Sequence, residues 1–330
     1  MKSSPITRRD FMQGTAFGLG IVQAAPLAAH GSEPVLVSVE KIWDRADYNS
    51  FTDLVRFQDR WYCTFREGVS HAGDIGVVRV LVSDDTEKWQ STGLVEESGI
   101  DLRDPKLSVM PDGRLMLVMG GSVNENGRYL TRSPRVSFSS DGAVWSAPRK
   151  VLAEDHWLWR ITWHKGHGYC LSKLNEGRRP RRGFLYTTTD CIEWDYITEF
   201  MVEGVSETTL RFMPDDEMIA LVRPGWIGHS FPPYKHWDFH KMEHQIGGPN
   251  FIRLPDGSLW ASGRRYNEDG TRHTVLARMT RERYEPVLTL PSGGDTSYPG
   301  MVWHNDMLWM SYYSSHEAKT SIYLAKIRFQ

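Results

Sequence analysis

A seven-residue pattern, Ser/Thr-x-Asp-x-x-x-Trp, occurs three times in the chain and constrains its fold more than any other feature. The copies span residues 83–89, 139–145 and 188–194, and a degenerate copy without the Asp spans residues 230–237. Each copy follows a run rich in β-forming residues. A turn Asp can hydrogen-bond its own backbone, and the Trp side chain can be buried between neighbouring sheets. Copies in one register, roughly fifty residues apart, predict an array of similar β units.

Six such units can be laid over one another between residue 51 and the C-terminus. They span residues 51–95, 102–152, 157–200, 206–245 and 247–290, and the sixth begins at residue 296. Each opens with an apolar strand, turns tightly, continues in a second apolar strand and ends with two outer strands. Trp, Tyr and Phe each occur 13 times, which also favours an all-β fold.

The sixth unit is one strand short, because the chain ends directly after the β-rich run at residues 321–329. The β-rich run at residues 34–41, ahead of unit one, can supply the missing strand. Such closure removes the exposed strand edges that an open array would have. The sequence therefore predicts one all-β domain over residues 31–330, a six-bladed β-propeller whose N-terminal strand closes the last blade.

The first 30 residues differ in character from the rest. Arg8 and Arg9 precede an apolar stretch rich in Gly and Ala at residues 14–25, and small residues follow it. This arrangement is similar to a twin-arginine export signal, and the apolar stretch is too short for a membrane anchor. We expect residues 1–30 to be removed on export, which leaves a periplasmic or secreted protein without a membrane span.

Charge and cysteine content argue against several other classes of protein. The formal net charge is −2, so the chain lacks the basic surplus of a nucleic-acid-binding protein. Three cysteines cannot all pair with one another, and we interpret Cys63, Cys170 and Cys191 as packing residues. The sequence predicts no disulfide framework, metal site or cofactor.

Three histidines, His236, His240 and His244, are spaced four residues apart and would share one face of a strand. That spacing is compatible with a metal site. However, no carboxylate motif accompanies the histidines, and aromatic residues alternate with them. The pattern therefore favours a half-exposed outer strand.

Polar residues recur where the innermost strands of the units start and the second strands end. In a propeller both sets of positions lie on one face, around the central channel. A structural strand end is expected to be apolar or small, whereas most of these residues are charged or phenolic. The starts of the innermost strands carry Asp53, Asp104, Arg160, Glu207, Gly248 and Tyr298, and the ends of the second strands carry Arg66, Gly120, Arg223, Arg264 and Tyr313. A ring of polar groups at a channel mouth suits a saccharide site, although solvated strand ends would look similar.

Three short motifs resemble those of the sialidase superfamily, whose Asp-box the repeated pattern also resembles. The first, Phe65-Arg66-Glu67-Gly68, is similar to the end of the second strand in a sialidase first blade. The others, Ser206-Glu207-Thr208 and Ser297-Tyr298-Pro299, are similar to the segments that carry the catalytic Glu and Tyr of the family. The resemblance implies a six-bladed propeller and an exo-acting glycoside hydrolase. Its substrate would be a glycan that ends in an acidic sugar, such as sialic acid.

The resemblance also implies roles for individual residues. Tyr298 matches the nucleophile, Glu207 the base that activates it, and Asp74 the acid/base residue. Arg223 and Arg264 match two of the three arginines that bind the substrate carboxylate. A carboxylate on the anomeric carbon would repel a carboxylate nucleophile, and a phenol avoids that repulsion. Arginine offers a fork of donors that fits a carboxylate.

The third arginine of the family is absent from its expected place, where the chain reads Ser50-Phe51-Thr52-Asp53-Leu54. Arg66, Arg103 and Arg160 are the candidates to replace it. We expect Arg66 to converge with Arg223 and Arg264, because the three share a blade position. Without a replacement, a uronic acid, another acidic sugar or a neutral glycan becomes the better substrate.

Other catalytic schemes remain open at this point. Asp104 and Glu207 could form the two-carboxylate pair of ordinary glycosidases, and Asp53 and His71 compete with Asp74 for the acid role. A propeller glycosidase or polysaccharide lyase acting on a glycan with uronic acid or rhamnose would use such a different set. A propeller that binds glycans without catalysis is the remaining alternative.

Overall fold

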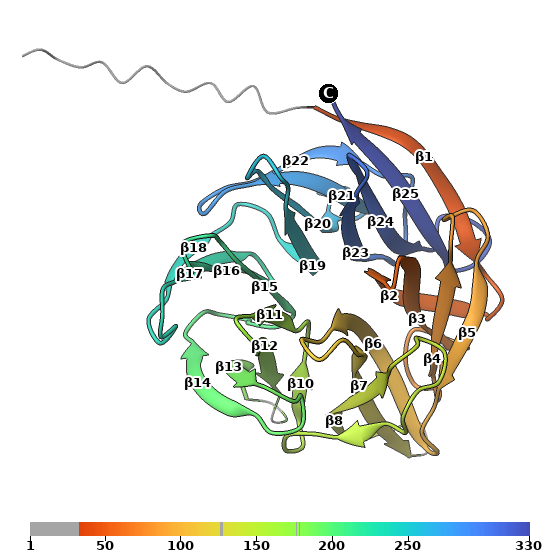
Figure 1. Cartoon of the computed structure of the whole chain (residues 1–330), viewed down its shortest axis with the longest axis horizontal. Helices are drawn as coiled ribbons and strands as arrows, with labels where there is room; N and C mark the ends of the chain where they lie inside the picture. The colour runs from red at the N-terminus through yellow and green to blue at the C-terminus, as the bar shows by residue number, and fades with distance from the viewer. Residues whose placement is uncertain (1–32, 126–127, 176, 178) are drawn as a thin grey trace, which may run out of the picture. The chain divides into compact units, whose positions relative to one another are not determined.

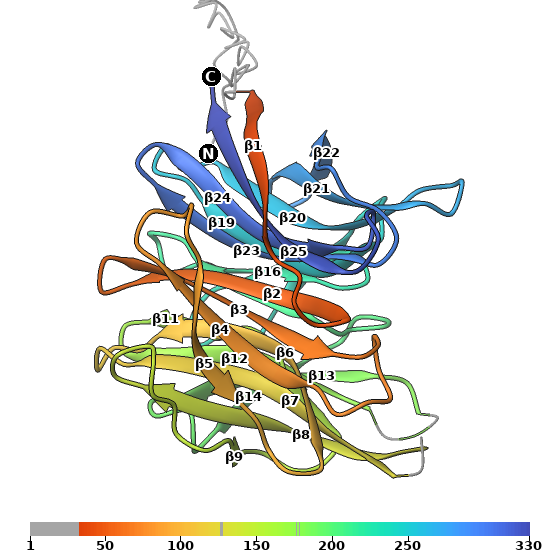
Figure 2. The ribbon, with the colours of Figure 1, turned by 90° about the vertical axis from the view of Figure 1, so that its right-hand side faces the viewer.

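The computed structural model describes residues 33–125, 128–175, 177 and 179–330. Over these residues the chain forms strands and turns and contains no helix. Six antiparallel sheets surround one central axis (Figures 1 and 2), so the predicted all-β, six-bladed β-propeller is confirmed. The expected export signal at residues 1–30 lies outside the described residues.

The blades follow one another along the chain, and each runs from an inner strand at the axis to an outer strand at the rim. Blades one and two contain β2 (Tyr48–Phe57), β3 (Arg60–Gly68), β4 (Val77–Ser83) and β5 (Gln90–Val95), then β6 (Ile100–Val109), β7 (Leu115–Glu125), β8 (Arg128–Ser139) and β9 (Arg149–Lys150). Blade three contains β10 (His156–Leu158), β11 (Thr162–His164), β12 (His167–Leu174), β13 (Arg182–Thr188) and β14 (Asp195–Phe200). Its inner strand is divided, since β10 and β11 both pair with β12.

Blades four and five have four strands each. They contain β15 (Thr208–Phe212), β16 (Met218–Val222), β17 (Trp226–Ser230) and β18 (Asp238–Lys241), then β19 (Ile246–Arg253), β20 (Leu259–Tyr266), β21 (Arg272–Met279) and β22 (Tyr284–Thr289). We call the face on which the inner strands begin and the second strands end the front face, and the opposite face the back face.

Both ends of the described chain contribute to blade six. Its strands are β23 (Thr296–His304), β24 (Met307–Ser314), β25 (Ser321–Phe329) and β1 (Pro34–Trp43). The outermost strand is β1, which pairs antiparallel with β25 from Pro34 opposite Phe329 to Trp43 opposite Ile322 (Figure 1). The predicted closure is confirmed, and the pairing extends two residues beyond the predicted 34–41.

A cluster of buried apolar side chains fills each junction between neighbouring blades. Burial of these side chains between the sheets is the main source of stability in such a fold. Cys63, Cys170 and Cys191 are buried within these clusters and unpaired, in agreement with the packing role predicted for them.

The repeated turn has the same structure in all three copies, between the third and fourth strands of blades one, two and three. In the first copy, Asp85 Oδ1 accepts hydrogen bonds from the backbone N–H groups of Glu87 and Lys88, both at 2.9 Å. Asp141 and Asp190 accept the corresponding pairs of bonds in the other copies. The Asp therefore holds its own turn, as the sequence pattern predicted.

The degenerate copy in blade four lacks the Asp but keeps the Trp. Trp237 Nε1 donates to the carbonyl of Tyr234 at 2.9 Å, as Trp89 donates to Thr86 in blade one. Tyr234 and Thr86 both have positive φ values, 63° and 69°. The bond from Trp to the turn carbonyl thus persists where the carboxylate is lost.

The inner strands of four blades share a bulge near their starts on the front face. Register shifts interrupt β2, β6, β19 and β23 at equivalent points, and each bulge contains a residue with positive φ. These residues are Phe51 (64°), Asp104 (52°), Gly248 (60°) and Tyr298 (55°). Such conformations are unfavourable for residues other than glycine and concentrate at functional sites. The bulges reorient the side chains that line the front end of the axis.

Candidate active site

Tyr298 and Glu207 are in direct contact at the front end of the axis. Tyr298 lies on the bulge of β23, and Glu207 directly precedes β15. The Tyr298 hydroxyl donates a hydrogen bond of 2.8 Å to Glu207 Oε1. Both residues are buried, with exposed fractions of 6% and 5%. The structure thus brings together the two residues that the resemblance pairs as nucleophile and base.

Aromatic rings from three blades hold the Tyr298 ring in place. Phe51, Trp159 and Tyr313 have ring centroids 5.0, 5.4 and 5.8 Å from that of Tyr298. Gly248 of blade five packs against the same ring, and a Cβ atom at this position would lie 2.6 Å from Tyr298 Cδ2. A side chain at position 248 is therefore excluded both by this approach and by the positive φ.

Two donors bind the Glu207 carboxylate in addition to the phenol. Arg223 Nη1 lies 2.8 and 2.9 Å from its two oxygens, and the Gly248 N–H donates to Oε2 at 2.9 Å. Burial by itself raises the pKa of a carboxyl group. Here Arg223, Lys173 and the hydrogen bonds outweigh burial and lower the pKa of Glu207 to about 2.

The Tyr298 phenol is neutral in this arrangement. Burial, the Glu207 carboxylate and the Asp104 carboxylate raise the pKa of Tyr298 well above its ordinary value. The pair therefore consists of a carboxylate that accepts and a phenol that donates. This is the protonation state that a phenolic nucleophile with a carboxylate base requires before reaction.

Arg223 and Arg264 flank Tyr298. Arg223 Nη1 lies 3.4 Å from the Tyr298 hydroxyl, and its Nη2 lies 3.3 Å from the hydroxyl of Tyr266. The Arg264 guanidinium carbon is 5.8 Å from the centroid of the Tyr298 ring. Arg264 Nη2 binds Asp295 at 2.6 Å and the Tyr313 hydroxyl at 2.8 Å. Each arginine is thus matched by a carboxylate of the protein.

Arg66 does not join these two arginines, which corrects the expectation from its blade position. Its side chain has no solvent exposure and lies between blades one and two. Arg66 Nε donates to Asp101 at 2.8 Å, and Nη2 lies 3.2 Å from Asp74. Two carboxylates draw the guanidinium into the blade junction, so Arg66 connects the blades and replaces no arginine of the family triad.

Asp74 is held in its loop by several donors. It accepts hydrogen bonds from Val69 N at 2.6 Å and from Ser70 Oγ at 2.8 Å, and Arg66 lies beside it. Burial raises the pKa of this carboxyl group, but the hydrogen bonds and Arg66 lower it to about 2. A general acid must retain its proton near neutral pH, and these contacts favour the ionised form.

Asp53 and Arg160 bind each other in the interior of the axis. Arg160 Nη1 lies 2.6 Å from both oxygens of Asp53, which also accepts the backbone N–H of Leu107 at 2.9 Å. Asp53 lies two residues beyond the bulge, so Phe51 occupies the front position instead of Asp53. The pair links blades one, two and three, and neither residue is available to a ligand in the way the sequence predicted.

Asp104 differs from the other carboxylates of the region. It lies on the bulge of β6 at the position equivalent to Tyr298, and its Oδ1 is buried without a hydrogen-bond partner among the described residues.

The adjacent Arg103 packs over the Phe51 ring at 5.0 Å and donates to the His71 carbonyl at 3.1 Å. His71 itself lies 2.7 Å from Asp295.

Sequence reasoning missed two lysines of the site. Lys106 is buried, with Nζ 4.7 Å from the Trp159 ring centroid and 5.6 Å from that of Tyr298. Burial lowers its pKa to about 8. Lys173, near the front end of β12, acts on the charge of Glu207. Lys106 could have been identified from the sequence, because it is a lysine inside an otherwise apolar inner strand. No comparable sequence feature identifies Lys173.

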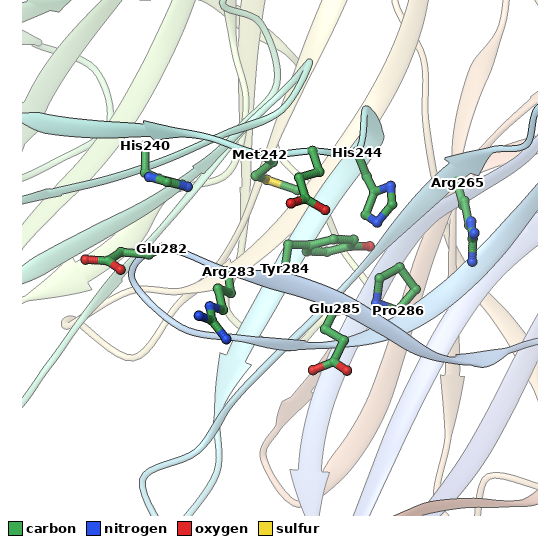
Figure 3. A pocket seen from close by; sticks show the side chains of 10 residues that line it. His240, Met242, His244, Arg265, Glu282, Arg283, Tyr284, Glu285 and Pro286 are labelled. Carbon is green, nitrogen blue, oxygen red and sulfur yellow. The ribbon is translucent and has the colours of Figure 1, made fainter. Parts of the chain in front are cut away.

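Two of the three spaced histidines, His240 and His244, line a separate cleft between blades four and five. This cleft of about 660 Å³ is lined by His240, His244, Arg265, Tyr284 and neighbouring residues of the two blades (Figure 3). Within the described part of the chain, no three His, Cys, Asp or Glu side chains are grouped to hold a metal ion. His240 lies on the outermost strand of its blade, β18.

Solved structures share this fold at low sequence identity. A protein of unknown function from Dyadobacter fermentans superposes with a TM-score of 0.79 at 16% identity, covering 90% of this chain and 99% of that one. Trypanosoma rangeli sialidase gives 0.69 at 12% identity, covering 90% of this chain but 60% of the sialidase. The GH93 α-L-arabinofuranosidase of Fusarium graminearum gives 0.69 at 14% identity, covering 89% and 98%.

These likenesses show the fold, a six-bladed β-propeller such as the sialidase and the arabinofuranosidase have. The chain matches no protein-family model and no curated protein sequence. Among its described residues there is also no apolar helix of the length that crosses a bilayer.

Proposed function

We propose that the protein is an exo-acting glycoside hydrolase that releases a terminal acidic sugar from a glycan at Tyr298 and Glu207. The observation that carries this proposal is the 2.8 Å hydrogen bond from the Tyr298 hydroxyl to Glu207, with Arg223 bound to the same carboxylate. Two of the similar structures, the sialidase and the arabinofuranosidase, are themselves named as enzymes that act on glycosides.

In the proposed reaction, Tyr298 Oη attacks the anomeric carbon and its proton passes to Glu207 Oε1. The bond between the anomeric carbon and the leaving oxygen breaks, and a carboxylic acid of the site protonates that oxygen. Water then attacks the anomeric carbon and gives a proton to the carboxylate that the acid has become; the sugar–tyrosine bond breaks, and Glu207 returns its proton to the phenol. Arg223 stabilises Glu207 as the carboxylate before the transfer.

A second scheme has Glu207 and Asp104 as the two carboxylates, with Tyr298 only lining the site. Two observations favour it. Asp104 Oδ1 has no hydrogen-bond partner among the residues that the structure describes, whereas Asp74, the acid expected from the resemblance, accepts several hydrogen bonds. In addition, the pKa of Glu207 is low and that of Tyr298 is high. Transfer of the phenol proton to Glu207 is therefore energetically unfavourable in the protein without substrate.

The test is a screen of the protein without residues 1–30 against fluorogenic sialosides, uronides, rhamnosides and arabinofuranosides. We expect turnover of an acidic sugar that Tyr298→Phe abolishes. No turnover of any glycoside by a folded protein would leave glycan binding without catalysis as the function. Turnover that survives in Tyr298→Phe would favour the two-carboxylate scheme.

A further inference from the structure

Lys173 presents an ammonium group that no other described residue binds. It lies near the front end of β12, where its cross-strand neighbour is Trp157. Lys173 Nζ is 5.5 Å from the centroid of the Trp157 ring. Among the described residues, no hydrogen bond or ion pair reaches this ammonium group, although it has three N–H donors to satisfy.

The surroundings of Lys173 combine positive charge with aromatic rings. The Arg132 guanidinium lies 5.8 Å from the Trp157 ring and 4.6 Å from the ring of Tyr129. Trp157 Nε1 is buried and has no hydrogen-bond partner within the part of the chain that the structure describes. A Cβ atom at Gly120 of blade two would lie 2.0 Å from the Trp157 ring. Only glycine at this position leaves room for the ring. Two cations, Lys173 and Arg132, therefore lie within 6 Å of the centroid of one ring, whose own N–H donor is without a partner among the described residues.

The same ammonium group lies in the electrostatic field of the candidate active site. Burial lowers the pKa of Lys173 to about 8, the charges of Glu207 and Asp104 act against that shift, and Arg132 and Arg181 add to it. Lys173 in turn contributes to the low pKa of Glu207. Lys173 and Glu207 thus act on each other's charge, and both lie at front-face strand ends, Lys173 near the end of β12 and Glu207 directly before β15.

The arginines of the site are already matched by carboxylates of the protein. Glu207 binds Arg223, Asp295 binds Arg264, and Arg66 is enclosed by Asp101 and Asp74. An anionic group of a substrate would have to compete with these carboxylates for any of the three. Lys173 has no such competitor, because the charges that act on it from Glu207 and Asp104 come without direct contact.

We propose that Lys173, assisted by Arg132 and Trp157 Nε1, binds an anionic oxygen group of the substrate at the front face between blades two and three. The group is a carboxylate or a sulfate ester, which share the acceptor oxygens that an ammonium and an indole N–H can bind. That the ligand is a glycan rests on the proposed function; that it is anionic rests on Lys173 and its surroundings.

Calorimetric titration at constant ionic strength tests the proposal with three sugars of one shape. D-Glucuronate carries a carboxylate, D-glucose 6-sulfate carries a sulfate ester, and D-glucose is neutral. We expect one or both anionic sugars to bind more tightly than glucose. Lys173→Met, which keeps the side-chain length but removes the charge, should weaken that binding by about ten- to a hundredfold, the range of one charge-assisted hydrogen bond. The anionic sugar that loses affinity identifies the group.

Lys165→Met is the matched control. Lys165 lies at the back end of the same blade, exposed and 2.7 Å from Asp216, and its loss should leave sugar binding unchanged. Lys173→Arg, which restores the charge, should retain most of the affinity. Circular dichroism and thermal melting confirm that the variants are folded.

Equal affinity of Lys173→Met and the parent for both anionic sugars would overturn the proposal, as would a parent that prefers neither of them to glucose. A different result is expected if the proposed function is wrong but the anion site is correct. In that case no glycoside is hydrolysed, yet the difference in anion binding between Lys173→Met and Lys165→Met persists.

Discussion

The hydroxyl of Tyr298 and the carboxylate of Glu207 form a 2.8 Å hydrogen bond although 91 residues separate them in the chain. Tyr298 belongs to blade six and Glu207 to blade four, so the contact joins two blades that are not neighbours. Gly248 of the intervening blade donates to the same carboxylate and packs against the same phenol ring. The pair is therefore held by three consecutive blades.

The first prediction concerns this pair. Tyr298→Phe keeps the ring and its packing against Phe51 and Trp159 but removes the attacking oxygen. If Tyr298 is the nucleophile, turnover should fall by several powers of ten, as is typical when one member of a cooperating catalytic set is lost. Steady-state kinetics on a substrate that the parent hydrolyses measures the effect.

Asp104→Asn is the companion variant. If Tyr298 only lines the site, its loss costs about one hydrogen bond, roughly a tenfold decrease in rate. The two-carboxylate scheme then requires Asp104→Asn to be the inactive variant. Near-normal Tyr298→Phe together with inactive Asp104→Asn rules out the tyrosine mechanism.

The second prediction concerns Arg66, whose side chain pairs with Asp101 without solvent exposure. Arg66→Met should lower the free energy of unfolding by about 3–5 kcal/mol, because it removes the closest countercharge of the buried Asp101 and leaves only Arg103, at 3.8 Å. The double variant Arg66→Met with Asp101→Asn should recover part of that loss. Urea denaturation measures both, and anion binding should stay unchanged in any variant that is still folded. A stable Arg66→Met protein with weakened anion binding would instead return Arg66 to the ligand site.

The repeats and the motif order were enough to predict the fold and the Tyr298–Glu207 contact. Spacing locates each blade, and a blade position determines where a Cα atom lies on the propeller. It does not determine where a long side chain extends. Arg66 and Arg264 occupy equivalent positions, yet Arg66 turns to Asp101 whereas Arg264 turns to Asp295. The carboxylates responsible lie in other strands and loops.

Local irregularity limited the prediction in a second way. The bulge in β2 places Phe51 on the front face and moves Asp53 into the axis, where it binds Arg160. The expectation that side chains alternate strictly between the two faces of a strand does not predict this arrangement. A bulge moves every later side chain of the strand to the opposite face. Lys173 escaped notice for a related reason: Trp157 faces it across blade three, and only the approach of blade two brings Arg132 to the same ring.

The third prediction is a pH dependence of stability that originates at Glu207. Its pKa lies near 2 in the folded protein, below the ordinary value of 4.5 that holds in the unfolded chain. A lowered pKa stabilises the fold above pH 4.5, and this contribution is lost as the pH falls toward 2. The parent should therefore lose more unfolding free energy between pH 5 and pH 3 than Glu207→Gln does.

Urea unfolding of both proteins at the two pH values measures this difference. Glu193→Gln, in an exposed turn of blade three, is the control and should follow the parent. Parallel losses in the parent and in Glu207→Gln would show that Glu207 gains no stabilisation from Arg223 and its other donors.

The last prediction concerns the closure of the ring by β1. Ten residues of this strand cover the edge of β25, from Pro34 opposite Phe329 to Trp43 opposite Ile322. Removing residues 1–43 should expose a long strand edge, which is a template for pairing with other chains. We expect this shortened protein to aggregate and to melt at a lower temperature, as measured by light scattering and calorimetry. A protein that begins at Glu33 keeps the whole of β1 and serves as the control, which should remain dispersed. If the two shortened proteins behave alike, β1 adds little to the stability of blade six.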